Sequence, residues 1–431
     1  MLHPTLRLRI AVGFVERFLN TIITPLMAIY LAAEVGAALA GLLVFLAVGI
    51  SVAASLFGGP VADVYGRRMP LIVGTAGSAL AFGGMALFSS PWINSAISVY
   101  LFYVLNTSLS SFALPANEAM IVDTTSSDER KGIYTLQYWS VNVALAAGAL
   151  TAGFLYADFF AAMLGVAAAI AGTAALVSVR YLAETAPQRP AGQAAPRPSS
   201  MLRMSSLITS YTGVLKDSMF LRLVLGMTLW LGIEMQMVGY VAVRLAEDMN
   251  PQQFLSIDID GYRMLGILRS ENTLLIVILA FFSERLLRHL PDGRRAYWGI
   301  ALFAAGMAAL GFSNSVMLLL IAVAALTVGE LMHIPVMQAM LADLVPEQSR
   351  TTYLAVFKLS IQGGLIIASL GLSLSAVLPP WGMAASFVAM AALIIVSYRP
   401  VIARLGQPTA ADATDEASGK TTGEASVAES D

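Results

Sequence analysis

The sequence predicts an all-helical membrane protein with twelve transmembrane helices arranged as two six-helix bundles. Three observations support this fold class: the composition, a regular series of apolar segments and an internal repeat. Hydrophobic residues make up 58% of the 431 residues and charged residues only 12%, whereas a soluble domain is about 25% charged. The mean hydropathy is +0.75. Lipid is therefore expected to surround most of the chain.

The apolar segments are long and numerous enough for twelve membrane spans. Because the hydrocarbon core of a bilayer is about 30 Å thick, a spanning helix needs about 20 mostly apolar residues. The first segment is too long for the apolar part of a cleavable signal peptide, so we expect it to be retained as a helix. The expected spans are residues 9–33, 37–61, 70–89, 95–121, 133–156, 159–182, 219–243, 264–287, 296–313, 316–344, 352–377 and 381–398.

Two polar segments divide this series. Residues 183–218 contain prolines among small and polar residues, which is typical of a linker. Residues 405–431 are rich in Ala, Thr, Ser, Asp and Glu, and are expected to form a disordered tail. The predicted organisation is therefore an N-terminal bundle over 1–182, a cytoplasmic linker, a C-terminal bundle over 219–404 and a cytoplasmic tail.

An internal repeat relates the two predicted bundles. The pattern Pro-x3-Ala-Met-x2-Asp ends the fourth span at Pro115 to Asp123 and recurs at the end of the tenth span, from Pro335 to Asp343. An arginine follows seven residues later in both copies, Arg130 after Asp123 and Arg350 after Asp343. Transporter folds are commonly built from such duplicated helical units.

The distribution of basic residues predicts the orientation. Most basic residues of the expected loops fall on the side that also holds both termini, and the exceptions are Arg244 and Arg263. By the positive-inside rule, both termini are expected in the cytoplasm. The chain is thus predicted to be a multi-pass protein of the cytoplasmic (inner) membrane.

The connection between the second and third spans carries a motif, Gly59-Pro-Val-Ala-Asp63-Val-Tyr-Gly66-Arg67-Arg68. Gly59 has no side chain, so another helix can approach it closely. Asp63 lies at a helix end, where it can face a helix N-terminus or an arginine. Gly66 permits a tight turn, and Arg67 and Arg68 hold the loop in the cytoplasm. We interpret these five residues as a conformational motif.

This loop resembles the signature of the major facilitator superfamily, G-x3-D-x2-G-R-[RK]. The whole chain resembles the LmrP-type multidrug/proton antiporters, a drug-exporting branch of that superfamily. The stretches that carry this second resemblance are Asn117–Asp123, Gly261–Leu265 and Gly329–Pro335. It implies the major facilitator fold, alternating access, and export of lipophilic, often cationic compounds in exchange for protons.

The resemblance also implies site residues. The proton-linked carboxylates of the family correspond here to Asp63, Asp123 and Glu330. For Asp123, a cap or a salt bridge with a nearby arginine is an equally good interpretation. For Glu330, the alternative is a structural carboxylate bonded to a neighbouring helix.

The chain departs from the family pattern at several positions. The family has an aspartate where Gln137 stands and an acidic residue where Val238 stands. Glu234 precedes Val238 by one helical turn, so it can serve the same face of a continuous helix. The first span carries Glu16 and Arg17, where a family member has small residues.

Charged residues inside the spans are the other candidates for function. A charge at the bilayer centre costs about 2.5–3.5 kcal/mol even on a lenient scale, so such residues face a cavity or a partner. Glu330, Glu234, Glu16 and Arg17 are therefore the predicted substrate-binding residues. Other buried groups are expected to be structural: Arg269 and Glu271 as interfacial residues and His333 as a bonded helix-contact residue.

The predicted function is proton-coupled export of lipophilic compounds by a monomeric carrier. The alternatives are a facilitator for a small metabolite, such as a sugar or an amino-acid derivative, and a facilitator-like sensor that transports nothing. No arrangement of residues typical of an enzyme or of nucleic-acid binding is visible. The absence of cysteine and the three scattered histidines exclude thiolate and sequence-local metal sites, so no cofactor and no metal is expected.

Overall fold

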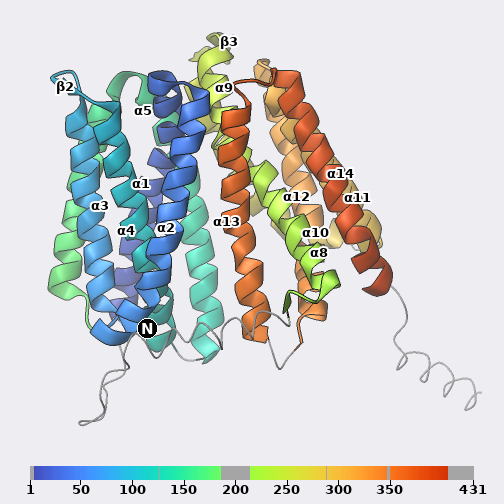
Figure 1. The fold of residues 1–431 in the computed structure, drawn as a ribbon, viewed down its shortest axis with the longest axis horizontal. Helices are drawn as coiled ribbons and strands as arrows, with labels where there is room; N and C mark the ends of the chain where they lie inside the picture. Colours follow the sequence, from blue (N-terminus) through green and yellow to red (C-terminus); the bar gives the residue numbers. More distant parts are fainter. Residues whose placement is uncertain (1–3, 126, 186–213, 288, 347–349, 406–431) are drawn as a thin grey trace, which may run out of the picture.

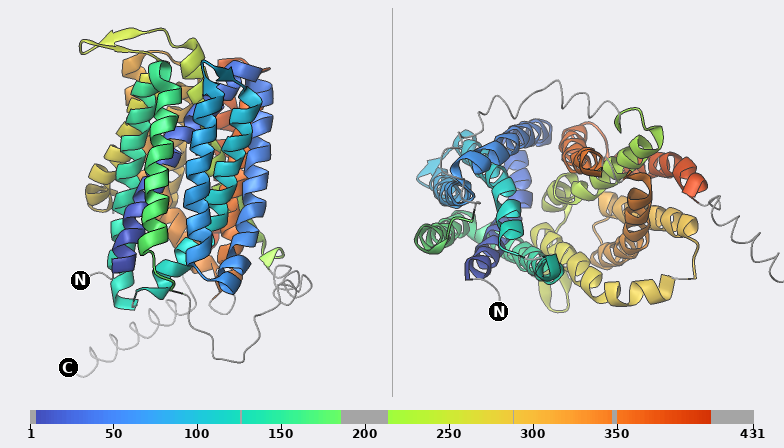
Figure 2. Two further views of the ribbon diagram at one scale, coloured as in Figure 1. Left: turned by 90° about the vertical axis from the view of Figure 1, so that its left-hand side faces the viewer. Right: turned by 90° about the horizontal axis from the view of Figure 1, so that it is seen from below.

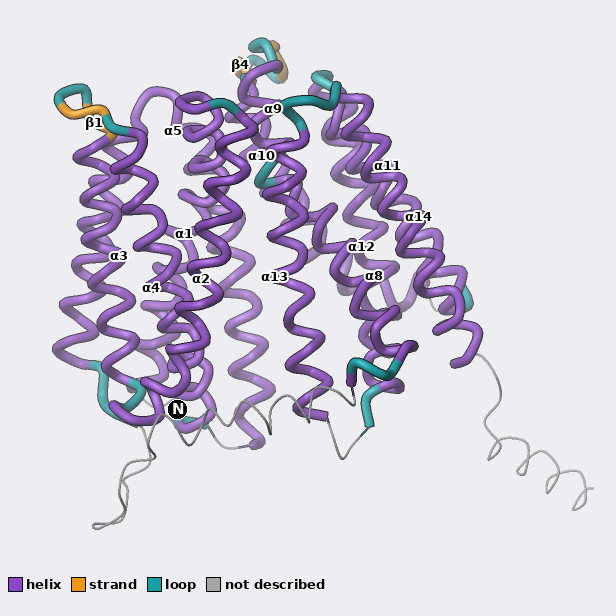
Figure 3. Tube along the Cα trace, in the orientation of Figure 1, coloured by secondary structure: helices purple, strands orange, loops and turns teal. Residues whose placement is uncertain are grey.

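The chain folds into a bundle of long helices that run roughly along one direction (Figure 1). The structure is a computed structural model, and it describes residues 4–125, 127–185, 214–287, 289–346 and 350–405. The predicted tail and most of the predicted linker lie outside these residues. The ends of the described chain lie on one face, which we call the terminal side (Figure 1). Two short β-hairpins lie on the opposite side (Figure 3).

The first group of helices contains five helical segments and one hairpin. The helices are apolar over most of their length, which agrees with the predicted spans. The elements are α1 (Pro4–Val35), α2 (Ala37–Tyr65), α3 (Arg68–Phe88), β1 (Ser89–Ser90), β2 (Ile93–Asn94), α4 (Ala96–Asp123) and α5 (Ser127–Tyr181).

The α5 segment is two helices joined by a bend. Its 55 residues would make a straight helix of roughly 80 Å, far longer than a bilayer is thick. At Phe159 the backbone leaves the helical region, with φ −132° and ψ 24°. The bend falls where two separate spans, 133–156 and 159–182, are predicted. Both ends of α5 lie on the terminal side (Figure 1).

The second group contains seven α-helices, one short 3₁₀ turn and the second hairpin. As in the first group, proline occurs inside several helices, including α12 at Pro335. The elements are α8 (Ser218–Glu234), η1 (Met235–Met237), α9 (Tyr240–Asp248), β3 (Gln252–Phe254), β4 (Ile257–Ile259), α10 (Gly261–Leu287), α11 (Asp292–Phe312), α12 (Val316–Leu344), α13 (Arg350–Leu374) and α14 (Pro380–Leu405).

The predicted seventh span is broken in the structure. A continuous helix over 219–243 is expected, but α8 ends at Glu234 and α9 begins at Tyr240. Between them lies the 3₁₀ turn, followed by Gly239 with φ −101° and ψ −103°. Val238 therefore lies outside both helices. The expectation that Glu234 and Val238 share one helix face is wrong, because the helix stops between them.

The two groups pack against each other through two pairs of helices, α2 with α13 and α5 with α10 (Figure 2, right). On the opposite side the Ser373 hydroxyl donates to the Ala38 carbonyl at 2.9 Å. The α5–α10 contact is closest at Gly153 and Gly266. A Cβ on Gly153 would lie 2.7 Å from the Tyr262 carbonyl oxygen, so only glycine fits there. The groups are therefore in tight contact on the opposite side.

Ten helices in the described part of the chain are long and apolar enough to cross a membrane. This count takes bent α5 as one helix and leaves out α10, which carries the charged residues Arg263, Arg269 and Glu271. The fold is that of an all-helical membrane protein, as predicted. The exact number of twelve spans stays a prediction. It is supported by the two helices of α5 on either side of the bend and by the 27 residues of α10.

Candidate functional site

The loop motif places one arginine between two acidic residues. Nη1 of Arg67 donates to Asp63, one helical turn earlier, and its Nε donates to Asp123 Oδ2 at 3.4 Å. Partial burial disfavours the charged guanidinium, but the hydrogen bonds and charges of Asp63 and Asp123 outweigh it and raise the pKa of Arg67. Arg67 therefore stays protonated and holds these two predicted proton-coupling residues together.

A third acidic residue, Glu184, closes this loop. Its Oε1 accepts from the backbone N–H of Arg67 at 2.8 Å, and its Oε2 accepts from that of Arg68 at 3.1 Å. Gly66 has φ +92°, and a Cβ there would collide with the Glu184 carboxylate. The Arg68 guanidinium in turn donates to the carbonyl of Val179 at 2.5 Å. The motif is thus docked onto the end of α5.

The close helix approach in the motif is at Gly58 and not at Gly59. A Cβ on Gly58 would collide with the backbone of Phe112 in α4. The nearest atom to a Cβ on Gly59 is the Pro115 Cβ, at an ordinary 3.9 Å. The predicted packing role of Gly59 is therefore filled by its neighbour, because it is Gly58 that faces α4.

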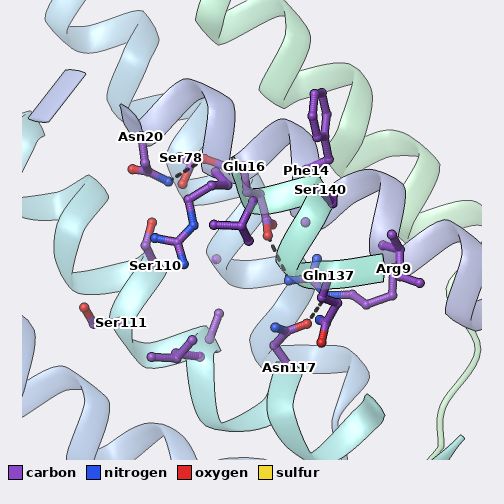
Figure 4. A pocket seen from close by; sticks show the side chains of 17 residues that line it. Arg9, Phe14, Glu16, Asn20, Ser78, Ser110, Ser111, Asn117, Gln137 and Ser140 are labelled. Carbon is purple, nitrogen blue, oxygen red and sulfur yellow. Dashed lines mark hydrogen bonds and ion pairs between the residues drawn. The ribbon is translucent and has the colours of Figure 1, made fainter. Parts of the chain in front are cut away.

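A polar cavity of about 340 Å³ lies among α1, α3, α4 and α5 (Figure 4). Arg9 lines this cavity and is only 6% exposed. Arg9 Nη2 donates to Glu16 Oε2 at 2.8 Å, and Nε donates to Asn117 Oδ1 at 2.5 Å. The Thr75 hydroxyl donates to Glu16 Oε1 at 2.6 Å. Both carboxylate oxygens of Glu16 are therefore engaged within the protein.

A larger vestibule of about 900 Å³ adjoins this cavity on the terminal side. Lys358 of α13 lines it from the second group, and its Nζ lies 3.8 Å from Glu118 Oε2 of α4. Arg17 and Gln137 line both the cavity and the vestibule. The predicted substrate-binding residue Arg17 thus lies at the junction of the two spaces, and its side chain is exposed there.

The predicted acidic residues of the second group form a charge cluster. The Asn272 amide donates to Thr327 Oγ1 at 3.0 Å and to Glu330 Oε2 at 3.4 Å. One turn before Asn272 on α10, Arg269 interacts electrostatically with both Glu330 and Glu234. The two glutamates also interact with each other. The structure therefore brings both glutamates to one arginine.

Arg269 and Glu271 lie further from the start of α10 than the predicted span, which begins at 264, places them. These residues lie roughly 12 and 15 Å along α10 from Gly261, at about 1.5 Å per residue, in a helix of 27 residues. Both side chains are half-buried. The run of charges near the start of α10 suggests a helix end, but the helix begins eight residues earlier than Arg269.

His333 is a packing residue. It is fully buried, with its ring centroid 4.2 Å from that of Trp230 and 5.5 Å from that of Tyr398. Trp230 also stacks on Phe303 at 3.9 Å. This environment agrees with a contact between helices, but the expected bonding is wrong, because among the described residues neither ring nitrogen has a hydrogen-bond partner.

Sequence reasoning did not identify Arg9, Glu184, Asn272 or the role of Arg269. Only Arg9 left a usable signal, since it precedes Glu16 by seven residues and so lies on the same helix face. The partners of the other three lie on different helices, far away in the sequence. Their roles depend on how the helices are placed in the bundle.

Long apolar helices around polar cavities and buried charges define a multi-pass membrane transporter, not an enzyme. The chain belongs to the Major Facilitator Superfamily, whose family model matches residues 10–305. This confirms the family that the loop motif predicts.

Two named relatives are similar to this chain over most of its length. A Na(+), Li(+), K(+)/H(+) antiporter of Planococcus maritimus is 28% identical over 89% of this chain and 92% of its own length. The multidrug resistance protein MdtH of Proteus mirabilis (strain HI4320) is 22% identical over 81% of both chains.

The fold is also that of solved transporter structures. The peptide transporter POT in complex with sulfate superposes with a TM-score of 0.69, at 15% identity, over 93% of this chain and 94% of its own. The POT family transporter PepTSo superposes with a TM-score of 0.68, at 16% identity, over 94% and 98%. At such low identity the likeness concerns the fold alone.

Proposed function

We propose that this protein is a secondary active transporter that exports lipophilic, often cationic compounds in exchange for protons. The single observation that carries the proposal is the charge cluster of Glu234, Glu330 and Arg269. Two carboxylates interact electrostatically with one guanidinium, so the cluster has one acid in excess. A buried carboxylate without a counter-charge must hold either a proton or another cation. Protons and a cationic substrate would therefore compete for one site.

The position of Arg269 suggests how this competition would act on the conformation. Arg269 lies between Gly266 and Ser270 on α10. Gly266 packs closely on α5, and the Ser270 hydroxyl donates to the Ala146 carbonyl at 2.9 Å. A change in the charge of the glutamates alters the force on Arg269, and hence on the contact that closes the opposite side. A ligand shifts a two-state balance only through such differential contacts.

In this proposal, the two halves of the carrier are residues 1–182 and 219–404, with 183–218 as the cytoplasmic linker and 405–431 as the tail. Asp63 and Asp123, both held by Arg67, would link protons to the terminal side. The basic loops on that side support its assignment to the cytoplasm. The carrier would work as a monomer in the inner membrane.

A second candidate is the exchange of monovalent metal cations for protons. One observation favours it: the relative with 28% identity over 89% of this chain is named as an antiporter of Na(+), Li(+) and K(+). The same acid excess at Glu234 and Glu330 would serve such an ion, because carboxylate oxygens suit hard cations.

Proteoliposomes with an imposed pH gradient distinguish these functions. Internal pH is recorded while a lipophilic cation, a neutral compound of similar size, Na⁺ or K⁺ is added. We expect the lipophilic cation to release protons and the alkali ions to do so weakly. Proton flux with Na⁺ or K⁺ alone would favour the second candidate. Uptake of a small metabolite without proton flux would contradict both.

Glu330→Gln and Glu234→Gln then test the site. Each substitution removes the excess acid of the cluster. Transport of the cation should therefore fall about ten-fold more than transport of the neutral compound, a difference that corresponds to about 1.4 kcal/mol. The matched control is Glu247→Gln, at an exposed glutamate of α9. This substitution should change the transport of neither compound. Equal losses of transport for both compounds in both variants would show that the cluster does not distinguish substrates by their charge.

A further inference from the structure

The cavity of the first helix group holds one cation without a counter-charge. Its charged lining residues are Arg9, Glu16 and Arg17. Arg9 and Glu16 form an ion pair at 2.8 Å. Across the described residues, the Arg17 side chain has neither an ion pair nor a hydrogen-bond partner. The cavity therefore carries an excess positive charge at Arg17.

The vestibule leads to the same residue. Its other charged lining residues form pairs, Lys358 with Glu118 and Arg67 with Asp123. Arg17 is again left over. One guanidinium therefore gives both spaces their excess charge, and it lies where the two spaces join.

The surroundings of Arg17 are suited to an anion. An unpaired charge within the membrane is costly unless it meets water or a partner. Hydroxyl and amide side chains line the same cavity and can donate hydrogen bonds to an anion: Ser78, Ser110, Ser111, Gln137 and Ser140 (Figure 4). A guanidinium binds a carboxylate through two parallel hydrogen bonds. The cavity volume of about 340 Å³ is within the range of small-molecule sites.

We propose that Arg17 binds the carboxylate of an amphoteric substrate, a compound with both an acidic group and an amine. The excess charges of the two helix groups are opposite, since the first holds the unpaired Arg17 and the second holds the extra acid of Glu234 and Glu330. A compound that carries both charges would be complementary in charge to each of the two groups. This inference rests on the proposed transport function and restricts its substrates to lipophilic compounds that carry a carboxylate as well as an amine.

Binding to the purified full-length protein tests the proposal without any gradient. Equilibrium dialysis compares an aromatic amino acid with its methyl ester, which keeps the amine and loses the carboxylate. Wild type should bind the amino acid at least about ten-fold more tightly than the ester, as expected for a charge-assisted bidentate pair. Arg17→Gln should abolish this preference, and Arg17→Lys should keep part of it. Arg222→Gln, at an exposed arginine of α8, is the matched control and should keep it fully.

Three outcomes would overturn the proposal. The first is a wild-type protein that binds both compounds equally, and the second is an Arg17→Gln variant that keeps the full preference. In the third, phosphatidylglycerol added to nanodiscs displaces the amino acid from wild type, which would make a lipid phosphate the natural ligand. Tight, Arg17-dependent binding without any proton-coupled transport would instead contradict the proposed function and leave the subsite intact.

Discussion

Arg67 shows how one residue can connect a loop to two helices. It pairs with Asp63 at the end of α2 and with Asp123 at the end of α4, while Glu184 caps its backbone N–H. The two carboxylates accept from different nitrogens of one guanidinium, Nη1 and Nε, so the loss of either leaves Arg67 one acidic partner. The motif is therefore suited to change partners when the helices move.

Asp63→Asn should slow transport while the protein still folds and inserts. Arg67 keeps Asp123, and the Asp63 side chain is 43% exposed, so the lost ion pair contributes only about 0.5–1 kcal/mol. We expect transport to fall about two- to five-fold. The measurement is the initial transport rate at equal protein level in proteoliposomes. Asp158→Asn, at an exposed aspartate near the bend of α5, is the control. A normal rate for Asp63→Asn would remove Asp63 from the mechanism.

Single residues could be predicted from the sequence where the signal lies within one helix or one loop. The loop motif and the depth of Glu330 are such cases, and so is the face that Arg9 and Glu16 share. The electrostatic interaction of Arg269 with Glu234 could not be predicted, because it relates α10 to the end of α8. It exists only when two distant helices are packed together.

At the scale of elements, the break after Glu234 is the feature that changes the interpretation most. A continuous seventh helix would put Glu234 one turn from the position of the family's acid. The break instead places Glu234 at the end of α8, next to an irregular turn that ends at Gly239. Discontinuous helices are common at transporter binding sites, because backbone groups at helix ends can meet ligands. Hydrophobicity alone did not reveal it, since the segment is mostly apolar on both sides of the break.

Gly153→Ala should loosen the contact between α5 and α10. The added Cβ would lie 2.7 Å from the Tyr262 carbonyl oxygen and 3.0 Å from the Gly266 Cα. Both are backbone atoms, which cannot move aside without moving the helix. We expect the opposite side to open more often.

The protein has no cysteine, so a single Ile29→Cys reports this opening directly. Ile29 is 3% exposed and faces the same contact. A membrane-impermeant maleimide should label it about five-fold faster in the Gly153→Ala background, the effect of about 1 kcal/mol. Gly165→Ala is the control, since a Cβ there meets nothing within 4 Å. Equal labelling in both backgrounds would show that this contact does not hold the opposite side closed.

On the scale of the whole molecule, the internal repeat predicts two related groups of helices. Both copies of the repeat end a helix, α4 at Asp123 and α12 at Leu344. The contacts α2 with α13 and α5 with α10 are equivalent when the two groups are exchanged. The sequence could not predict which side is closed, because both states of a carrier have the same sequence and differ only in how the groups are tilted.

Reporter fusions should place both the linker and the tail in the cytoplasm. A fusion after Arg404 and one within residues 187–200 should each give a cytoplasmic signal, because the loops on the terminal side carry most of the basic residues. Alkaline phosphatase and a fluorescent protein, which are active on different sides, serve as paired reporters. A fusion within residues 255–256, in the hairpin on the opposite side, should give the reverse signal. A periplasmic signal from the linker would mean an odd number of spans before it.

The vestibule must close if the carrier alternates, and Glu118 and Lys358 mark where it would do so. They approach to 3.8 Å across the two helix groups, but their side chains are 60% and 70% exposed. Such a pair contributes about 0.2–1 kcal/mol, so it does not fix the state by itself. Glu118 and Lys358 are instead useful as positions for a cross-link, because they line the vestibule from the two helix groups.

We therefore expect that a short cross-link between Glu118→Cys and Lys358→Cys abolishes transport, because it fixes the distance between the two groups on the terminal side, which must change when the vestibule closes. A disulfide-containing bifunctional thiosulfonate makes the link, and reductant should restore the rate. Each single variant treated with the same reagent should keep most of its transport, since the ion pair is weak. If the cross-linked double variant transports at the uncross-linked rate, the two groups do not move relative to each other at this point, and the proposed alternation on the terminal side is wrong.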